Sequence, residues 1–207
     1  MIQQALLVGL LEVNCYILGD EETKEAVVID PGGDEDEILE ALAFHSLKLK
    51  LIIDTHGHFD HVDANQPLKD ATGAQIAIHA LDAHMLSQPS AEAMFFTGNR
   101  LRLSAADILL KENDVLTFGP YRLKVLHTPG HTPGHITLLM ENQPLLYVGD
   151  LLFQGSIGRT DFPGGSFDAL ISSVKTKIFP LGDHYTVFPG HGPVTTVGQE
   201  RKYNPFF

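Results

Sequence analysis

Cysteine and basic residues are scarce in this chain, and both shortages restrict what the protein can do. Cys15 is the only cysteine, so no disulfide can form within the chain, and its apolar neighbours predict a buried strand position. Lys and Arg number 14 against 26 Asp and Glu, which gives a formal net charge of -12. Nucleic-acid binding depends on clustered basic residues, so this composition argues against a nucleic-acid partner.

Long apolar segments are also missing. No run approaches the ~18 consecutive apolar residues of a membrane-spanning helix. The apolar stretch Ala5–Leu11 lacks the basic residues and the cleavage pattern of an export signal. The sequence therefore predicts a cytoplasmic protein without a membrane partner. Its 207 residues, 43% hydrophobic and 19% charged, are typical of one compact domain covering residues 1–207.

Short apolar runs alternate with amphipathic stretches along the chain. The runs that predict strands are Val13–Leu18, Ala26–Ile29, Leu49–Ile53, Gln75–Ile78, Tyr121–Leu126, Ile136–Met140, Leu145–Val148 and Tyr185–Phe188. The stretches that predict helices are Asp34–His45, Asp63–Thr72, Ser166–Lys177 and Thr196–Tyr203. Asp63 and Ser166 are the expected N-caps. This alternation in both halves predicts a layered α/β domain, with a helix-covered sheet from each half. The aperiodic region Ser87–Ser104 predicts a long, partly apolar loop or lid.

Potential metal ligands are concentrated in four short segments, each after a predicted strand. The segment Thr55–His61 holds three histidines and one aspartate directly after the apolar run Leu51–Ile53. The other segments are Pro129–His135, Val148–Asp150 and Pro189–Gly192, and each contains glycine. Any one of these polar residues alone is typical of a loop or a helix cap. Their combination at strand ends predicts a metal site.

The spacing of these residues predicts a site for two ions. Imidazoles at positions i and i+2 of an extended segment project to the same side, so His56 and His58 can bind one ion together. Asp60 and His61 follow where the chain should turn into a helix, which directs them toward a second ion. The predicted ligands are His56, His58 and His131 for the first ion, Asp60, His61 and His191 for the second, and Asp150 as a bridge.

Seven ligands shared by two ions leave coordination positions open, which is typical of catalytic sites. A hydroxide held between the ions is available near neutral pH, because metal coordination lowers the pKa of water from 15.7 toward ~7. Asp60 would bind one ion and also act in catalysis, by orienting this hydroxide or accepting its proton. Two zinc ions are the default expectation, and iron and manganese also accept His and Asp ligands. We expect His135 to anchor the His131 loop by hydrogen bonding without touching metal.

The order of the motifs, Thr-His-x-His-x-Asp-His, Pro-Gly-His-Thr-Pro-Gly-His, Gly-Asp and Pro-Gly-His-Gly, resembles the metallo-β-lactamase superfamily along nearly the entire chain. The resemblance implies an α/β fold of the αβ/βα four-layer sandwich type, with a binuclear site at one edge. It also implies that Asp30, in the segment Val28–Gly33, supports the site.

Within that superfamily, the segment Gly155–Phe162 and the ending Asn204–Phe207 look closest to short bacterial glyoxalase II-like hydrolases. These enzymes hydrolyse hydroxyacylglutathione thioesters, so the resemblance implies a small-molecule thioester substrate derived from glutathione. Full-length glyoxalase II carries a C-terminal helical region with much of the glutathione-binding surface, and this chain ends before it. Arg159 lies where the resemblance places a basic substrate contact. The alternative is that Arg159 pairs with Asp161 to hold its loop.

Other interpretations fit part of the same pattern. Persulfide dioxygenases share this fold and a similar arginine-containing loop, and their single iron would use His56, His131 and Asp150 here. Lactonase, phosphodiesterase or β-lactamase activity is compatible with the ligands alone. A non-enzymatic metal-binding module would be expected to close its site with protein ligands. Metal counting and a panel of substrates would separate these interpretations.

Overall fold

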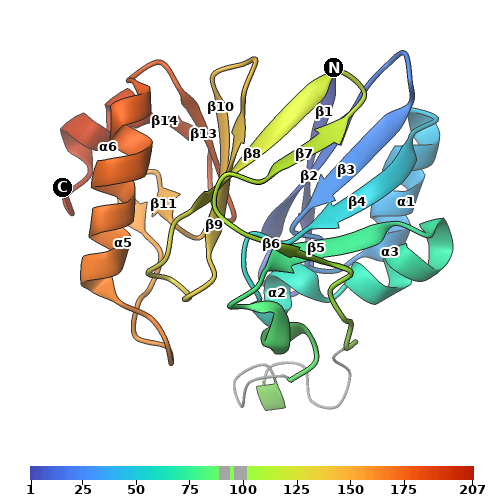
Figure 1. The fold of residues 1–207 in the computed structure, drawn as a ribbon, viewed down its shortest axis with the longest axis horizontal. Coiled ribbons are helices and arrows are strands. Elements are labelled where there is room, and N and C mark those ends of the chain that lie inside the picture. The colour runs from blue at the N-terminus through green and yellow to red at the C-terminus, as the bar shows by residue number, and fades with distance from the viewer. Residues whose placement is uncertain (89–93, 96–101) are drawn as a thin grey trace.

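The described part of the chain forms two six-stranded sheets with helices outside them (Figure 1). The structure, a computed structural model, describes residues 1–88, 94–95 and 102–207. The first sheet has the order β1 (Ile2–Val8), β2 (Val13–Gly19), β3 (Glu25–Ile29), β4 (Lys48–Ile53), β5 (Gln75–His79) and β6 (Ile108–Leu110). The second has the order β14 (Thr195–Thr196), β13 (Thr186–Pro189), β10 (Leu145–Gly149), β9 (Ile136–Met140), β8 (Tyr121–His127) and β7 (Val115–Phe118). β11 (Leu152–Phe153) and β12 (Ser156–Ile157) form a separate ribbon.

The helices lie in two groups, one for each sheet (Figure 1). α1 (Glu35–Phe44) and α3 (Asn65–Thr72) lie beside the first sheet, and α5 (Phe167–Ser173) and α6 (Val197–Tyr203) lie beside the second. The short α2 (Phe59–Val62) follows the end of β4. The remaining helical turns are η1 (Ala83–Leu86), η3 (Val174–Ile178) and η4 (Phe179–Leu181).

Strand β2 shows why the sequence makes layers, because successive side chains of a strand point to opposite faces. Cys15 and Ile17 belong to the core that includes Ile38 of α1 and Leu68 of α3. Tyr16 and the other alternate residues face the second sheet, in a core that both sheets share. A third core packs α5 and α6 on the second sheet. The predicted αβ/βα four-layer sandwich in a single domain is therefore confirmed, and Cys15 is buried as expected.

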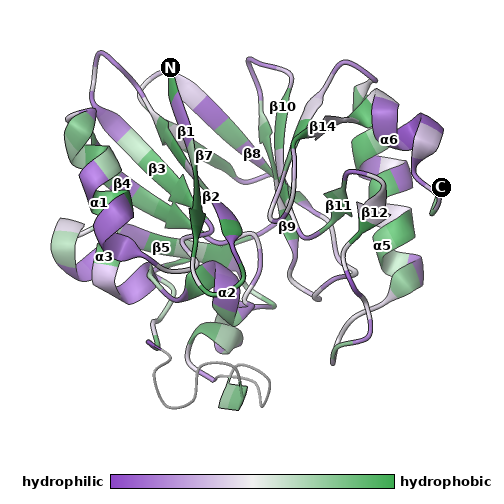
Figure 2. Ribbon diagram, turned by 180° about the vertical axis from the view of Figure 1, so that it is seen from behind, coloured by the Kyte–Doolittle hydropathy of each residue, from purple (hydrophilic) through white to green (hydrophobic). Residues whose placement is uncertain are grey.

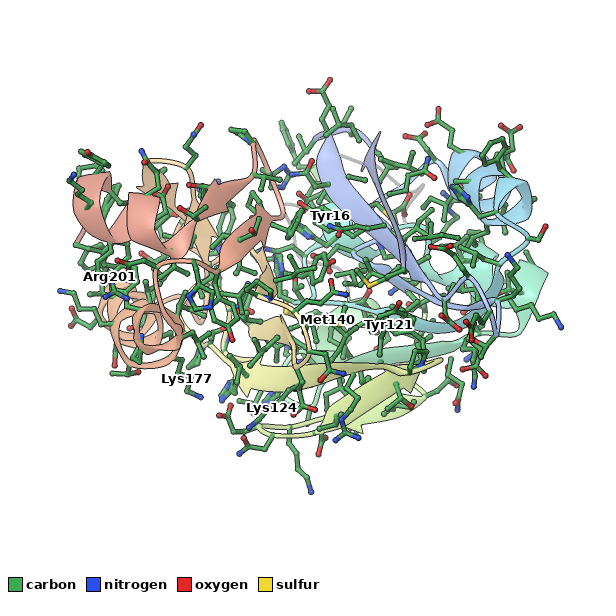
Figure 3. The ribbon with its side chains drawn as sticks, turned by 90° about the horizontal axis from the view of Figure 1, so that it is seen from above. Tyr16, Tyr121, Lys124, Met140, Lys177 and Arg201 are labelled. Carbon is green, nitrogen blue, oxygen red and sulfur yellow. The ribbon has the colours of Figure 1, made fainter. Side chains whose placement is uncertain are left out.

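The hydropathy of the elements agrees with this layering. Figure 2 shows apolar residues along the strands of both sheets, and polar residues on the outward sides of α1 and α3. In the view from above, Tyr16 and Met140 lie in the interior, whereas Lys124 and Arg201 lie at the periphery (Figure 3). Burial of apolar side chains on both faces of each sheet holds the strand ends in place, and the motifs sit on those ends.

All eight predicted strands and four predicted helices have counterparts, with ends that differ by a few residues. Ser166 caps α5, since its side chain accepts a hydrogen bond from the Ala169 backbone. The prediction that Asp63 caps a helix is wrong, because α3 begins after Ala64. Asp63 instead accepts a hydrogen bond from the backbone N–H of Arg102, at 3.1 Å, and lies 3.4 Å from its guanidinium.

Six strands were not predicted from the sequence, and they lie at sheet edges or are very short: β1, β6, β7, β11, β12 and β14. β1 is a half-exposed edge strand whose burial alternates, and most of its apolar residues belong to the stretch Ala5–Leu11, which runs past the end of the strand. The predicted lid at Ser87–Ser104 falls largely on residues 89–93 and 96–101, outside the described residues. Within the described residues, no helix has both the length and the apolar character needed to cross a bilayer.

Candidate metal centre

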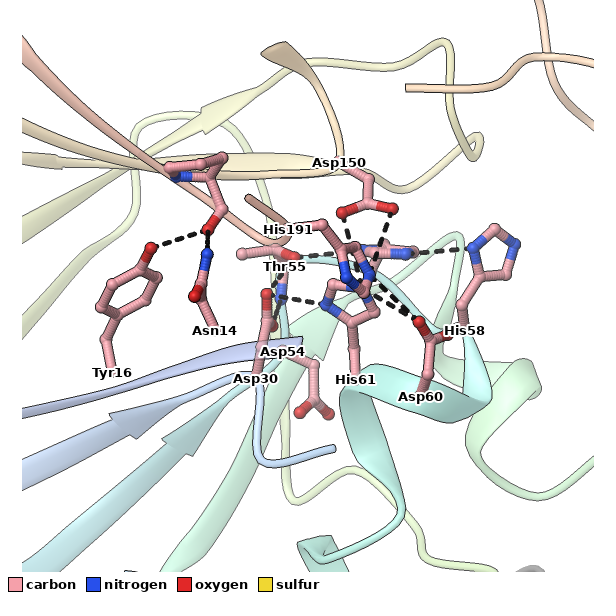
Figure 4. A network of polar contacts seen from close by, with 12 residues as sticks. Asn14, Tyr16, Asp30, Asp54, Thr55, His58, Asp60, His61, Asp150 and His191 are labelled. Atoms are coloured by element: carbon pink, nitrogen blue, oxygen red, sulfur yellow. Dashed lines mark hydrogen bonds and ion pairs between the residues drawn. The ribbon is translucent and has the colours of Figure 1, made fainter. Parts of the chain in front are cut away.

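The four motif segments meet at one edge of the sandwich, where strands of both sheets end (Figure 4). The structure brings all seven predicted ligands together in three overlapping clusters. These are His56, His58 and His131; His56, His61 and Asp150; and Asp60, His61 and His191. Within each cluster, one nitrogen or oxygen atom from every residue lies within 4.8 Å of the others. The first and third clusters match the two ligand sets predicted from the sequence.

Asp150 lies between the first and third clusters. Its Oδ1 is 3.5 Å from Nε2 of His61, and its Oδ2 is 3.6 Å from Nε2 of His131. Oδ2 is also 4.0 Å from Nε2 of His191. The carboxylate therefore lies near histidines of both clusters, which is the placement a bridging ligand needs.

A chain of hydrogen bonds orients the His56 ring. Backbone and hydroxyl groups of Thr55 donate to Asp30, each at 2.7 Å, so the Thr55 hydroxyl oxygen is left to accept. That oxygen lies 3.1 Å from Nδ1 of His56. We assign the ring proton to Nδ1 on this network, which leaves the lone pair of Nε2 directed into the site.

Two further rings are fixed through Nδ1 in the same way. Nδ1 of His61 lies 3.1 Å from the carboxylate of Asp30. Nδ1 of His131 lies 2.7 Å from the backbone carbonyl oxygen of Arg159. A neutral ring that donates from Nδ1 presents an unprotonated Nε2, which is the form that binds metal, so His61 would give up a proton on binding an ion. Asp30 thus supports the site, as the resemblance of the sequence to the superfamily implies.

The electrostatics of the site favour a cation. Burial opposes a charge on His61, but the three surrounding carboxylates, that of Asp150 foremost, raise the pKa of His61 to about 10. Burial and the neighbouring His131 lower the pKa of His58 to about 3. Burial also holds the pKa of His56 well below its usual range. Neutral imidazoles beside a strongly negative potential are what a divalent cation requires.

Two observations test whether metal fits these residues. Nε2 of His61 and Oδ1 of Asp150 are buried, yet neither has a hydrogen-bond partner among the described residues. Nδ1 of His58 lies 3.0 Å from Nε2 of His56 and 2.9 Å from Nε2 of His131. Tetrahedral ligands at zinc-to-nitrogen distances of 2.0–2.1 Å stand about 3.4 Å apart, close to this spacing. The donor set therefore fits divalent metal.

His191 is held by strand β2 of the opposite sheet. The backbone N–H of Asn14 donates to the carbonyl oxygen of Gly190 at 2.7 Å. The Tyr16 hydroxyl donates to the carbonyl oxygen of Pro189 at 2.7 Å (Figure 4). Position 190 must be glycine, because a Cβ there would lie 2.4 Å from Oδ1 of Asp150. This close approach places Nε2 of His191 at 3.2 Å from Oδ2 of Asp60.

The side chain of Arg159 forms a two-pronged ion pair with Asp161, with nitrogen-to-oxygen distances of 2.9 and 2.8 Å. Its guanidinium also stacks 3.6 Å above the centre of the Phe162 ring, and that ring is nearly perpendicular to the His58 ring, with 5.5 Å between the ring centres. The pairing with Asp161 is thus present in the structure. It does not oppose a substrate contact, because the Arg159 side chain is 54% exposed and lies beside the metal cluster.

Some contacts at the site were not anticipated from the sequence. Thr55 and the Arg159 carbonyl orient the rings of His56 and His131. These contacts depend on distances between segments, and no local pattern in the sequence indicates such distances. Asp82 is buried and hydrogen-bonds to both loops of the first cluster, although no motif contains it. His135 is outside all three clusters, and its Nδ1 lies 3.0 Å from the hydroxyl of Thr128, in line with the expected anchoring role.

Fold and site together define a metal-binding enzyme of the superfamily that the motifs resemble. The sequence model of the metallo-beta-lactamase superfamily matches residues 8–191. The chain belongs to this superfamily. Its fold implies binding of divalent metal, and the His and Asp clusters fit that requirement.

Particular relatives carry different names. The chain is 38% identical over 201 residues to the hydroxyacylglutathione hydrolase GloC of Haemophilus influenzae, covering 96% of this chain and 94% of that protein. The crystal structure of the B3 metallo-beta-lactamase BLEG-1 superposes with a TM-score of 0.93 at 38% identity, covering 99% of both chains. A di-iron-bound crystal form of the protein TTHA1623 gives a TM-score of 0.84 at 35% identity, covering 99% of this chain and 100% of that one.

Proposed function

We propose that this protein is a binuclear metallohydrolase that cleaves small-molecule thioesters, with hydroxyacylglutathione compounds such as S-lactoylglutathione as the expected substrates. The observation that carries the proposal is the pair of three-residue clusters, joined by Asp150, with buried ligand atoms left unpaired between them. The similarity to a hydroxyacylglutathione hydrolase over nearly all of both chains supports the choice of substrate.

In this proposal His56, His58 and His131 would hold one ion, Asp60, His61 and His191 would hold the other, and Asp150 would be shared between them. Ions held there would polarise the thioester carbonyl. They would also lower the pKa of bound water, so that hydroxide is available as the nucleophile near neutral pH. Zinc is the expected metal, and the di-iron form of a 35% identical protein supports testing iron as well.

The chain's own groups position the reaction. Asp60 is anchored through Oδ2 by His191, at 3.2 Å, so its other oxygen is available to orient the attacking water. Burial acts to raise the pKa of Asp60, but His61 and His191 outweigh it and lower that pKa, so the group stays charged at neutral pH. The water adds to the thioester carbonyl, the carbon–sulfur bond breaks, and the products are a carboxylic acid and a free thiol.

The test is a metal count on the purified protein followed by a panel of substrates. We expect two metal ions per chain and stoichiometric release of thiol from S-lactoylglutathione without oxygen consumption. One iron per chain, with oxygen uptake on glutathione persulfide, would instead identify the dioxygenase chemistry. Substrates with lactone and phosphodiester bonds complete the panel, and preferential cleavage of either would replace the thioester proposal.

β-Lactam hydrolysis is the second candidate, because the BLEG-1 β-lactamase is as similar in sequence as the thioester hydrolase relative. Both reactions need water delivered to a carbonyl carbon, and they differ in whether nitrogen or sulfur leaves. A β-lactam and S-lactoylglutathione compared on the same preparation distinguish them. We expect the higher kcat/KM with the thioester.

Replacing Arg159 with alanine is expected to raise the KM for S-lactoylglutathione by about tenfold and to leave kcat nearly unchanged. A guanidinium contact to a substrate carboxylate is worth roughly 1.5–3 kcal/mol, and partial exposure reduces this value. A thioester without carboxylates should show no change in KM. The matched control is Asp161→Asn, which removes the charge that pairs with Arg159 at this position and should not raise the KM. Equal effects of Arg159→Ala on charged and uncharged thioesters would contradict a substrate-binding role.

A further inference from the structure

Asp82 is a buried carboxylate between the two loops that carry the first metal cluster. It follows β5 and has no exposed surface. It occupies the N-cap position of η1, where aspartate usually accepts hydrogen bonds from the helix that follows, yet its side chain makes no such bond. The carboxylate is directed elsewhere.

Its partners belong to two segments that are far apart in sequence. Oδ2 accepts a hydrogen bond from the Thr132 hydroxyl at 2.6 Å and lies 3.3 Å from the backbone nitrogen of Gly57. Oδ1 accepts from the backbone nitrogen of Gly134 at 2.7 Å. Gly57 stands between His56 and His58, and Thr132 directly follows His131. One side chain therefore hydrogen-bonds to both loops of the same cluster.

The packing around Asp82 is tight. A Cβ on Gly134 would lie 2.6 Å from the carboxyl group of Asp82, so this loop approaches it as closely as glycine permits. The carboxylate and three donors are buried together, and a donor left without a partner there would be costly. The loops cannot shift relative to each other without losing one of these bonds.

We propose that Asp82 is a positioning residue that sets the spacing of His56, His58 and His131, and thereby the affinity of the protein for one of its two metal ions. The inference rests on the proposed metal site and is independent of the substrate. Asp30 orients a ligand of the third cluster in a more direct way, because its carboxylate lies 3.1 Å from Nδ1 of His61. Asp82 acts on the first cluster through the backbone of the loops.

The substitution Asp82→Asn separates this role from simple space filling. An amide has nearly the same shape but only one accepting oxygen. If the amide oxygen faces Gly134, the amide NH₂ faces the N–H of Gly57. If the amide is reversed, the NH₂ faces the N–H of Gly134. Either orientation leaves one backbone donor, the N–H of Gly57 or that of Gly134, without its bond, because a backbone N–H cannot accept a hydrogen bond.

Asp20→Asn is the matched control. Asp20 is also buried, and it accepts hydrogen bonds from the backbone and the hydroxyl of Thr23, both at 2.8 Å. It lies at the far end of strand β2 from the metal centre. The two substitutions therefore remove comparable hydrogen bonds, one of them beside the metal clusters and the other remote from them.

Zinc affinity measured in competition with a chelator is the test, on the full chain at each substitution. For Asp82→Asn we expect one ion to bind about tenfold more weakly and the other to bind as in the unchanged protein. Added zinc should restore kcat, with KM for the substrate unaltered. Asp20→Asn should retain both affinities even where thermal unfolding moves to lower temperature. Thr132→Val, which removes a single bond to Asp82, provides a milder variant if Asp82→Asn does not fold.

Three outcomes are distinguishable. Unaltered affinity for both ions in a folded Asp82→Asn or Thr132→Val protein would overturn the inference. Equal weakening of both ions, or the same weakening in Asp20→Asn, would also overturn it, because it would indicate general loss of stability. Absence of thioester hydrolysis in the unchanged protein, with two ions bound, would overturn the proposed substrate and leave the affinity test intact.

Discussion

Replacing Asp60 with asparagine is expected to lower kcat for thioester hydrolysis by about a thousandfold, within the range found for lost acid–base groups. Asp60 lies in α2 with its Oδ2 near Nε2 of both His191 and His61, at 3.2 and 3.7 Å. Asparagine keeps the shape and one oxygen but removes the negative charge that faces these rings. The measurement is kcat with S-lactoylglutathione, together with the metal content of the same sample.

Asp63→Asn is the control for this experiment. Asp63 is three residues further along, undergoes the same change of charge, and pairs with Arg102 outside the three clusters. It should retain kcat within about twofold, because its charge is partly exposed and screened by solvent. Full turnover by Asp60→Asn with both ions bound would refute the catalytic role. Loss of one ion together with turnover would assign Asp60 as a ligand and leave its role in orienting water unproven.

Removing metal with a chelator is expected to abolish turnover and to lower the unfolding temperature by about 8–16 °C for each ion removed. An ion that binds only the folded protein adds about 4 kcal/mol when its free concentration is a thousand times its Kd. In a domain of this size each kcal/mol moves the midpoint by about 2–4 °C. The metal stabilises the fold because, without it, buried Nε2 of His61 and Oδ1 of Asp150 have no hydrogen-bond partner among the described residues.

Thermal unfolding followed by circular dichroism, with and without chelator, measures this effect. Separate additions of zinc, iron and manganese to the stripped protein should restore turnover to different extents, and the order identifies the working metal. His184→Ala is a suitable control, since that histidine is exposed and outside the clusters, and it should respond to chelator as the unchanged protein does. Unchanged activity and stability after complete metal removal would contradict the proposed function.

The fold could be predicted in outline because burial leaves local patterns. Strand β9 was predicted with its correct ends, since its residues are mostly apolar and mostly buried. Strand β1 was missed because only alternate residues face the core. The cap of α3 was misplaced because the Asp63 carboxylate interacts with Arg102, 39 residues away. Propensity describes a residue and its neighbours, and it cannot anticipate a distant partner.

The sequence by itself determined which atoms are available for metal, because imidazole and carboxylate groups in four Gly-rich segments follow strands of a layered fold. Only the tertiary structure decided how these atoms meet. It brings Asp60 to His191 across 131 residues and directs the Arg159 carbonyl to His131. It also places Asp82, which belongs to none of the four motif segments, between two of their loops. Such contacts arise from the packing of whole sheets, which fixes distances that no local stretch of sequence contains.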